Sequence, residues 1–207
     1  MSGVAVLHLD ESCLGNGREG ENPGGGGALI EARSRNGRIQ RRDVYLSAPA
    51  TTNNRMALAS AALALELLAK KGARLQVLMV SDSQYLVRGM REWVPGWVSR
   101  GWRRKEGPIE NLALWQELLA ASRRHHVQWT WVRGHKGHGK NEYANDLAVK
   151  AAKEQINSDG IAASGFDDWL AAKRAKGFYL DYDPDEAFAV LERRLVEDET
   201  FPLAEGP

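Results

Sequence analysis

Two apolar stretches that each end in an aspartate constrain the fold more than any other feature of this sequence. "VAVLHLD" runs from Val4 to Asp10, and "LQVLMVSD" runs from Leu75 to Asp82. A continuous apolar run of this length is typical of a strand that is buried on both faces of a sheet. Because ligands of such sheets bind at the carboxyl ends of the parallel strands, we expect Asp10 and Asp82 to lie together.

The rest of the chain up to about residue 153 alternates between helix and strand patterns. A glycine-rich loop, "GNGREGENPGGGG", precedes an alternating segment that turns at Asn36-Gly37, which predicts a hairpin. A helix is predicted over 55–71 with Asn53 or Asn54 as its cap, and "VQWTWV" predicts a further strand. Other helices are predicted up to 91 and 98, over 109–123 and from about 142. This pattern predicts an α/β domain with an antiparallel hairpin joined to a partly parallel sheet.

Charge is divided unevenly along the chain. Residues 1–153 contain 23 Lys and Arg against 14 Asp and Glu, whereas residues 154–207 contain 5 against 13. A basic body favours a polyanionic partner, and an acidic tail does not suit contact with one. No apolar run could span a membrane, no signal peptide is recognisable, and Cys13 is the only cysteine. We therefore expect a cytoplasmic protein with no membrane association.

The segment 154–207 is predicted to be an acidic, partly helical C-terminal extension of a domain formed by residues 1–153. "GFDDWLAAKRAKG" reads as a short helix, and Asp183 with Glu186 forms a capping box for a second helix. Two interpretations remain open for this extension. It packs beside the sheet as a helical extension, which we prefer, or it docks on a basic surface and competes with nucleic acid.

Five motifs together resemble the bacterial type 1 ribonucleases H. They are "HLDESCLGN", "TTNNRM", "VSDSQY", "WVRGHKGH" and "NEYANDLA", in the order and at the spacings of that family, over roughly residues 4–153. The resemblance implies a ribonuclease H-like fold with a five-stranded mixed sheet flanked by helices. It also implies endonucleolytic cleavage of the RNA strand of RNA–DNA hybrids, with two Mg²⁺ or Mn²⁺ ions as cofactors.

The family binds its metal ions at four acidic positions, and this chain matches only part of that set. Asp10 and Asp82 match the first and third positions, whereas Ala57 stands at the position of a catalytic Glu and Asn145 at that of an Asp. The amide oxygen of Asn145 can still bind a hard cation. Its neighbour Asp146 lies about 100° around the helix and is expected to be a solvated acid.

Two other acids are candidates to replace the Glu that is missing at position 57. Glu66 lies nine residues after Ala57, and nine steps of about 100° place it on the opposite face of the helix. Glu11 follows Asp10 directly, but neighbours on a strand point to opposite faces. We therefore expect its carboxyl to point away from Asp10 unless the strand end twists.

The resemblance also implies roles in proton transfer and hybrid binding. His135 matches a loop histidine that acts near the metal ions, and an imidazole suits proton transfer near neutral pH. His138 is expected to be structural, and Trp115 and Trp129 to be core residues. Two interpretations of the tryptophans in a basic protrusion have equal weight: contact with the hybrid, or packing of the protrusion itself. The candidate hybrid-binding residues are Asn16, Thr52, Asn53, Asn54, Arg55, Gln84, Trp93, Trp97, Arg100, Trp102 and Arg103.

Ala57 leaves the activity of this chain open. The interpretation we favour is a ribonuclease H in which Glu has been replaced by Ala, an inactivated variant that keeps its binding residues. The alternative is a protein that binds RNA–DNA hybrids naturally without cutting them. A third possibility, an interaction module that uses its tail for protein partners, fits poorly with the retained groove residues and basic protrusion.

Overall fold

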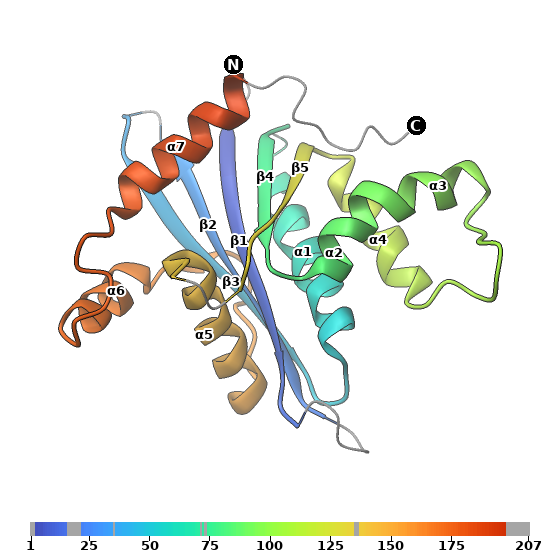
Figure 1. Ribbon diagram of the computed structural model, residues 1–207, viewed down its shortest axis with the longest axis horizontal. Coiled ribbons are helices and arrows are strands. Elements are labelled where there is room, and N and C mark those ends of the chain that lie inside the picture. The colour runs from blue at the N-terminus through green and yellow to red at the C-terminus, as the bar shows by residue number, and fades with distance from the viewer. Residues whose placement is uncertain are drawn as a thin grey trace.

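The computed structural model describes residues 3–15, 22–34, 36–70, 72, 74–134 and 137–197. These residues contain one mixed sheet with the strand order β5-β4-β1-β2-β3-β6 (Figure 1). β1 runs parallel to β4 and β4 parallel to β5, whereas β1, β2 and β3 form an antiparallel meander. The strands are β1 (Val4–Cys13), β2 (Gly24–Arg33), β3 (Ile39–Ala48), β4 (Gln76–Ser81), β5 (His126–Trp131) and β6 (Ala162–Ala163).

The expected number of five strands is wrong, because the sheet of the described residues has six. β6 is only two residues long and pairs with the outer edge of β3, where Ala162 and Ala163 lie opposite Asp43 and Arg42. It belongs to the part of the chain that the family resemblance does not cover. It covers part of a strand edge that would otherwise keep unpaired backbone groups.

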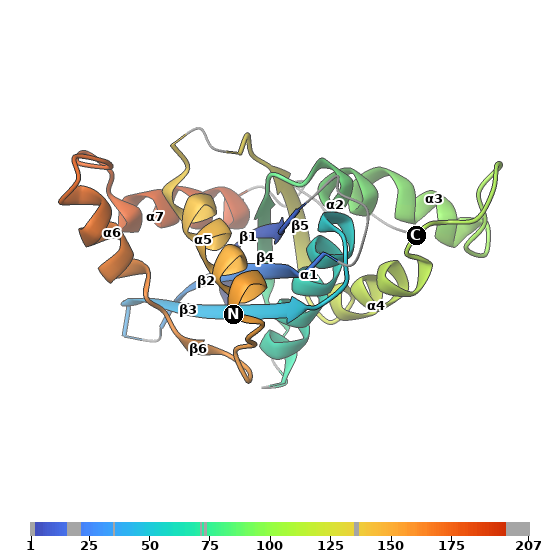
Figure 2. The ribbon, with the colours of Figure 1, turned by 90° about the horizontal axis from the view of Figure 1, so that it is seen from below.

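The helices lie in two layers on opposite faces of the sheet (Figure 2). On one face α1 packs against α4 and against β1 and β2, and on the other α5 packs against β1, β2 and β3. α7 lies on the α5 side, over β1 and β4. The helices are α1 (Asn53–Ala69), α2 (Gln84–Arg88), the π-helical turn η1 (Gly89–Trp93), α3 (Val94–Ser99), α4 (Leu112–Ser122), α5 (Gly139–Glu154), α6 (Phe166–Arg174) and α7 (Pro184–Glu197).

The last part of the predicted glycine-rich loop is a strand instead. Gly24 to Gly27 form the beginning of β2. Residues without a side chain are needed there because helices approach both faces of the sheet closely. A Cβ on Gly27 would lie 2.4 Å from the Ala144 carbonyl oxygen of α5, and a Cβ on Gly26 would lie 2.6 Å from Ser60 Cβ of α1. The glycines therefore let α5 lie against the sheet beside the end of β1.

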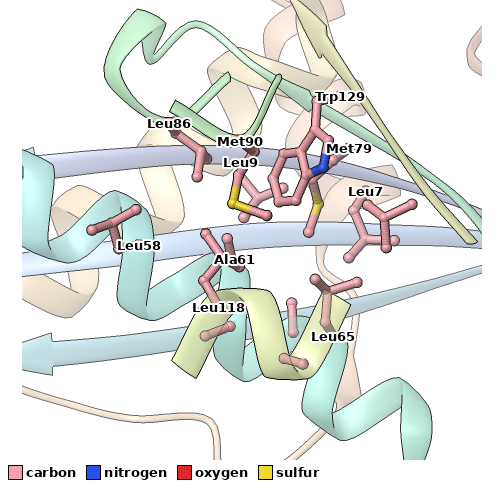
Figure 3. Packing of buried hydrophobic residues seen from close by; sticks show 14 of the residues in the cluster. Leu7, Leu9, Leu58, Ala61, Leu65, Met79, Leu86, Met90, Leu118 and Trp129 are labelled. Atoms are coloured by element: carbon pink, nitrogen blue, oxygen red, sulfur yellow. The ribbon is translucent and has the colours of Figure 1, made fainter. Parts of the chain in front are cut away.

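The side chains of β1 divide the interior into two parts. Leu7 and Leu9 point into the larger core between the sheet, α1 and α4, together with Leu58 and Leu65 (Figure 3). Val6 points to the opposite face and packs with residues of β4 and α7. Side chains an even number of residues apart on a strand point to the same face. Asp10 therefore lies on the α5 side with Val6, and Glu11 lies on the α1 side with Leu9.

α7 packs on the sheet through the apolar side chains of one face. Phe188 and Leu195 are buried and Leu191 partly buried, all in one cluster with Val6 and Leu78. The predicted cap is confirmed, since Asp183 Oδ1 accepts hydrogen bonds from the backbone N–H groups of Asp185 and Glu186 at 2.9 and 3.0 Å. Competition of this segment with nucleic acid, and a domain boundary after residue 153, stay predictions.

Among the described residues, no helix combines the length and the apolar character needed to cross a membrane.

Candidate active site

Asp10 and Asp82 lie together at the carboxyl ends of two adjacent parallel strands. The register of β1 and β4 pairs Leu9 with Ser81, so each aspartate is the next residue beyond the last pair. Burial and the charge of Asp82 raise the pKa of Asp10 to about 7. The expectation from the two apolar runs is therefore correct: the two carboxyls repel each other at one edge of the sheet.

Glu11 also interacts electrostatically with these aspartates, although its side chain belongs to the opposite face of β1, as expected. Burial, and then the charges of Asp10 and Asp82, raise the pKa of Glu11 to about 8, against a lowering hydrogen bond with Ser83. Glu11 does belong to the α1 face, opposite Gly26. Its longer side chain at the strand end nevertheless brings its carboxyl within range of both neighbouring charges.

Ala57 is a packing residue in the described structure. Its side chain is only 1% exposed and belongs to the core cluster on the α1 face, and its carbonyl oxygen accepts a hydrogen bond from Ser60 Oγ at 3.2 Å. The first turn of α1 contains no acid. α1 therefore supplies no carboxyl at the position where the resemblance implies a Glu.

α5 carries Asn141 and Asn145 on one face, one turn apart. Asn141 is 2% exposed, and its Nδ2 donates to Asp10 Oδ2 at 2.8 Å and to the Leu9 carbonyl oxygen at 3.4 Å. Sequence reasoning missed this residue, although its spacing of four from Asn145 was the signal that could have found it. Asn145 is half-buried on the same helix.

Asp146 is exposed and turned toward α6. Its Oδ2 accepts a hydrogen bond from Trp169 Nε1 at 2.7 Å and lies 3.7 Å from Lys173 Nζ. Its charge is the weakest of the influences on the pKa of Asp10. This agrees with the expectation of a surface acid rather than a metal ligand.

The backbone around Asp82 is held by the end of β5 and the residues after it. Trp131 Nε1 donates to the Asp82 carbonyl oxygen at 3.0 Å, and the Trp131 side chain is 43% exposed. A Cβ on Gly134 would lie only 2.0 Å from Asp82 Oδ2, so glycine is required for this close approach. His135, the next residue, and Asn16 lie outside the described residues, and their predicted roles are not tested.

The N-terminal end of α1 differs in detail from the prediction. Thr52 is the N-cap in place of Asn53 or Asn54, because its Oγ1 accepts from the Arg55 backbone N–H at 3.3 Å. Thr52, Asn54 and Arg55 are exposed, as is Gln84 at the start of α2. These four exposed side chains are free of the core, as a binding surface requires.

The tryptophans of the basic protrusion pack on the protein itself. The rings of Trp93 and Trp97 lie 6.4 and 5.8 Å from that of Trp115, which is fully buried. Trp102 is half-buried, whereas Arg100 and Arg103 are exposed. Trp115 and Trp129 are core residues, as predicted. Hybrid contacts of Trp93, Trp97 and Trp102 stay a prediction.

The site suits divalent cations by its chemistry. Oxygen ligands of carboxyls are what Mg²⁺ and Mn²⁺ prefer, and a bound cation would relieve the repulsion that raises the pKa values of Asp10 and Glu11. Within the part of the chain that is described, no three His, Cys, Asp or Glu side chains form a ready-made metal site. Water would therefore have to complete the coordination, as Mg²⁺ commonly allows.

A mixed sheet with two aspartates at the ends of parallel strands, faced by a helix with further polar side chains, is the arrangement of the ribonuclease H-like class of α/β proteins. The RNase H family model matches residues 3–153, so the chain belongs to the RNase H family. The chain is 41% identical over 161 residues to a ribonuclease H of Methylococcus capsulatus, covering 77% of this chain and 96% of that relative. It is 42% identical over 149 residues to a ribonuclease H of Pelobacter propionicus, covering 72% and 84%. The expectation of a hydrolase of the ribonuclease H kind is confirmed.

Solved structures agree with this assignment. The crystal structure of LC9-RNase H1, described as a type 1 RNase H with the type 2 active-site motif, has a TM-score of 0.78 and 54% identity, covering 83% of this chain and 82% of that one. LC11-RNase H1 in complex with an RNA/DNA hybrid has a TM-score of 0.52 at 18% identity, covering 73% and 98%, and shows the fold alone.

Proposed function

We propose that this chain is an endonuclease that hydrolyses the RNA strand of RNA–DNA hybrids with two Mg²⁺ or Mn²⁺ ions. The observation that carries the proposal is the register of β1 and β4, which places Asp10 and Asp82 at adjacent strand ends, with Glu11 next to Asp10. Membership of the RNase H family supports the choice of substrate. The single cysteine supports a cytoplasmic location.

Glu11 takes the place of the acid that position 57 lacks. Asp10, Glu11 and Asp82 supply carboxyl oxygens to the metal site, and Asn145 supplies an amide oxygen. The site then has three negative charges, so Ala57 need not be an inactivating change. The relative at 54% identity, described as carrying the type 2 active-site motif on a type 1 enzyme, supports variation of the motif on this fold.

The chemistry follows from these groups. When bound, two divalent ions activate water and stabilise the leaving oxygen of the phosphodiester. Asn141 holds Asp10 by its hydrogen bond, and Gly134 and Trp131 hold Asp82, so the two carboxylates keep a fixed separation. Exposed Thr52, Asn54, Arg55 and Gln84 bind the hybrid backbone and its minor groove, where 2′-hydroxyls distinguish RNA from DNA. Exposed Arg100 and Arg103 bind phosphates.

The test is cleavage of a labelled RNA–DNA hybrid with Mg²⁺ and with Mn²⁺, by this chain, Glu11→Gln, Ala57→Glu and Glu66→Gln. Glu66 is exposed on α1 and serves as a matched control for loss of one carboxylate. We expect cutting by this chain and by Glu66→Gln, and roughly a thousandfold loss in Glu11→Gln.

Two other outcomes identify the alternatives. If only Ala57→Glu cuts, the chain is an inactivated variant and Glu11 does not replace the missing acid. If every variant binds the hybrid and none cuts it, the chain is a hybrid-binding protein.

A further inference from the structure

The segment after α5 returns to touch the first turn of that helix. Lys140 Nζ donates to the Pro184 carbonyl oxygen at 2.8 Å and lies 6.0 Å from the centre of the Phe188 ring, both on α7. A Cβ on Gly139 would lie 3.3 Å from Tyr179 and 3.4 Å from Tyr182 in the α6–α7 connection. The first two residues of α5 are therefore held by a segment that lies outside the family match.

Lys140 is fixed on its other side by a buried carboxylate. Its Nζ lies 2.6 Å from Glu31 Oε2 of β2, and the side chains of Lys140 and Glu31 are 3% and 0% exposed. Arg41 Nε donates to Glu31 Oε1 at 3.0 Å and continues to Asp167 of α6 at 3.2 Å and to Asp185 of α7. His8 Nε2 of β1 also lies 3.3 Å from Glu31 Oε2, and we call this group of six side chains the Glu31 network. It joins the sheet, α5, α6 and α7.

Polar contacts, rather than a helix cap or dense packing, hold the start of α5. Its N-cap residue, His138, makes no side-chain capping bond. A cavity of about 200 Å³ lies between α5, α7, β4 and β5, with Val80, Val132 and Leu191 among its lining residues. Lys140 is one of the residues that line this cavity. Because the cavity reduces apolar packing around the first turn of α5, the contacts of Lys140 with Glu31 and Pro184 restrain that turn.

The residue after Lys140 is Asn141, which binds Asp10. A shift of the first turn of α5 would therefore move Asn141 Nδ2 away from Asp10 Oδ2, from which it now lies 2.8 Å. We propose that residues 178–197 position the active site through Lys140, by fixing the first turn of α5 so that Asn141 holds Asp10. Lys140 is a positioning residue in this proposal, which rests on the proposed function because cleavage is one of its readouts.

The test is a double-mutant cycle of Lys140→Met and Asn141→Ala, with kcat and KM for hybrid cleavage measured for all four chains. Met keeps the apolar stem of Lys and removes the donor. We expect Lys140→Met to lower kcat by about tenfold with little change in KM, because a small misplacement near the reacting groups is costly. In the Asn141→Ala background the same substitution should lower kcat no further. Independent, multiplicative losses would overturn the proposal.

A second pair of variants, both in α7, distinguishes a positioning role of Lys140 from a general loss of stability. Phe188→Leu removes the ring beside Lys140, and Leu195→Val trims a buried residue of the same helix two turns farther along. Hydrogen–deuterium exchange without metal should rise over residues 139–145 in Lys140→Met and Phe188→Leu but not in Leu195→Val. Equal exchange in all three, or a matching fall in kcat for Leu195→Val, would overturn the proposal.

The failure of this inference differs from that of the proposed function. If the unmodified chain does not cut hybrids, the proposed function fails, and the exchange measurement still decides whether Lys140 orders α5. If the chain cuts and the cycle shows no coupling, only the positioning role is lost.

Discussion

Two groups of buried charges lie on neighbouring parts of the same sheet, and they are balanced in opposite ways. At the ends of β1 and β4, burial and the charges of neighbouring acids raise the pKa values of Asp10 and Glu11 to about 7 and about 8. In the Glu31 network, burial alone would raise the pKa of Glu31, but contacts with His8 and Lys140 lower it instead. In the first group, neighbouring acids raise the pKa of a carboxyl, whereas in the second group basic side chains lower it.

This difference separates a site for chemistry from a structural junction. Uncompensated buried charge costs stability and is kept where a ligand or a reaction uses it. A compensated buried ion pair gains little stability over apolar packing, but removal of one partner is costly. The strand-end carboxyls should therefore respond to metal ions and pH, and the Glu31 network should respond to substitution of its members.

The largest effect should come from Asp10→Asn. We expect hybrid cleavage to fall by roughly 10³-fold, equivalent to about 4 kcal/mol, because a metal ligand and one of the repelling charges are both lost. The free energy of unfolding without metal should not fall, since the substitution relieves repulsion. Loss of both activity and stability would show that Asp10 is a structural acid.

Glu31→Gln should mainly lower stability, in contrast to Asp10→Asn, which should mainly lower cleavage. It leaves Lys140 and Arg41 without their shared buried carboxylate, and we expect the free energy of unfolding to fall by roughly 3 kcal/mol. Urea denaturation checks this value. An unchanged stability would contradict the view that this network is compensated in the folded chain.

The pH dependence of stability should distinguish the two groups. Without metal, the folded chain binds more protons at Asp10 and Glu11 than the unfolded chain between about pH 4 and pH 8. Their contribution to stability therefore decreases as the pH rises through this window. Relative to Asp10→Asn, the unmodified chain should lose roughly 2 kcal/mol between pH 5 and pH 8, and Mg²⁺ should reduce this loss. A difference independent of pH would contradict the raised pKa of Asp10.

The smallest effect is expected at the surface link between β2 and α7. Arg33 Nη2 lies 2.6 Å from Glu192 Oε2, but the Arg33 side chain is 38% exposed. Arg33→Met should change the free energy of unfolding by less than about 1 kcal/mol in a urea titration, since solvent and salt screen such pairs. A loss as large as that of Glu31→Gln would mean that burial does not separate these ion pairs.

The two aspartates could be predicted from the sequence because the apolar runs that precede them also determine their strands. The alternation of the strand predicted the face of Glu11 but not its electrostatic interaction with Asp10 and Asp82, since the reach of its side chain at the strand end matters as much as its face. Asn141 and Lys140 were missed because their partners, Asp10 and Glu31, lie more than 100 residues earlier in the chain. β6 was missed because two residues carry no strand pattern of their own.

The most direct measurement is a carboxyl ¹³C NMR titration of Asp10 and Glu11, with and without Mg²⁺. Without Mg²⁺ we expect pKa values of about 7 and about 8, and Mg²⁺ should lower both. Ordinary pKa values that Mg²⁺ leaves unchanged would contradict the central claim that these residues form an uncompensated carboxyl site completed by a metal ion.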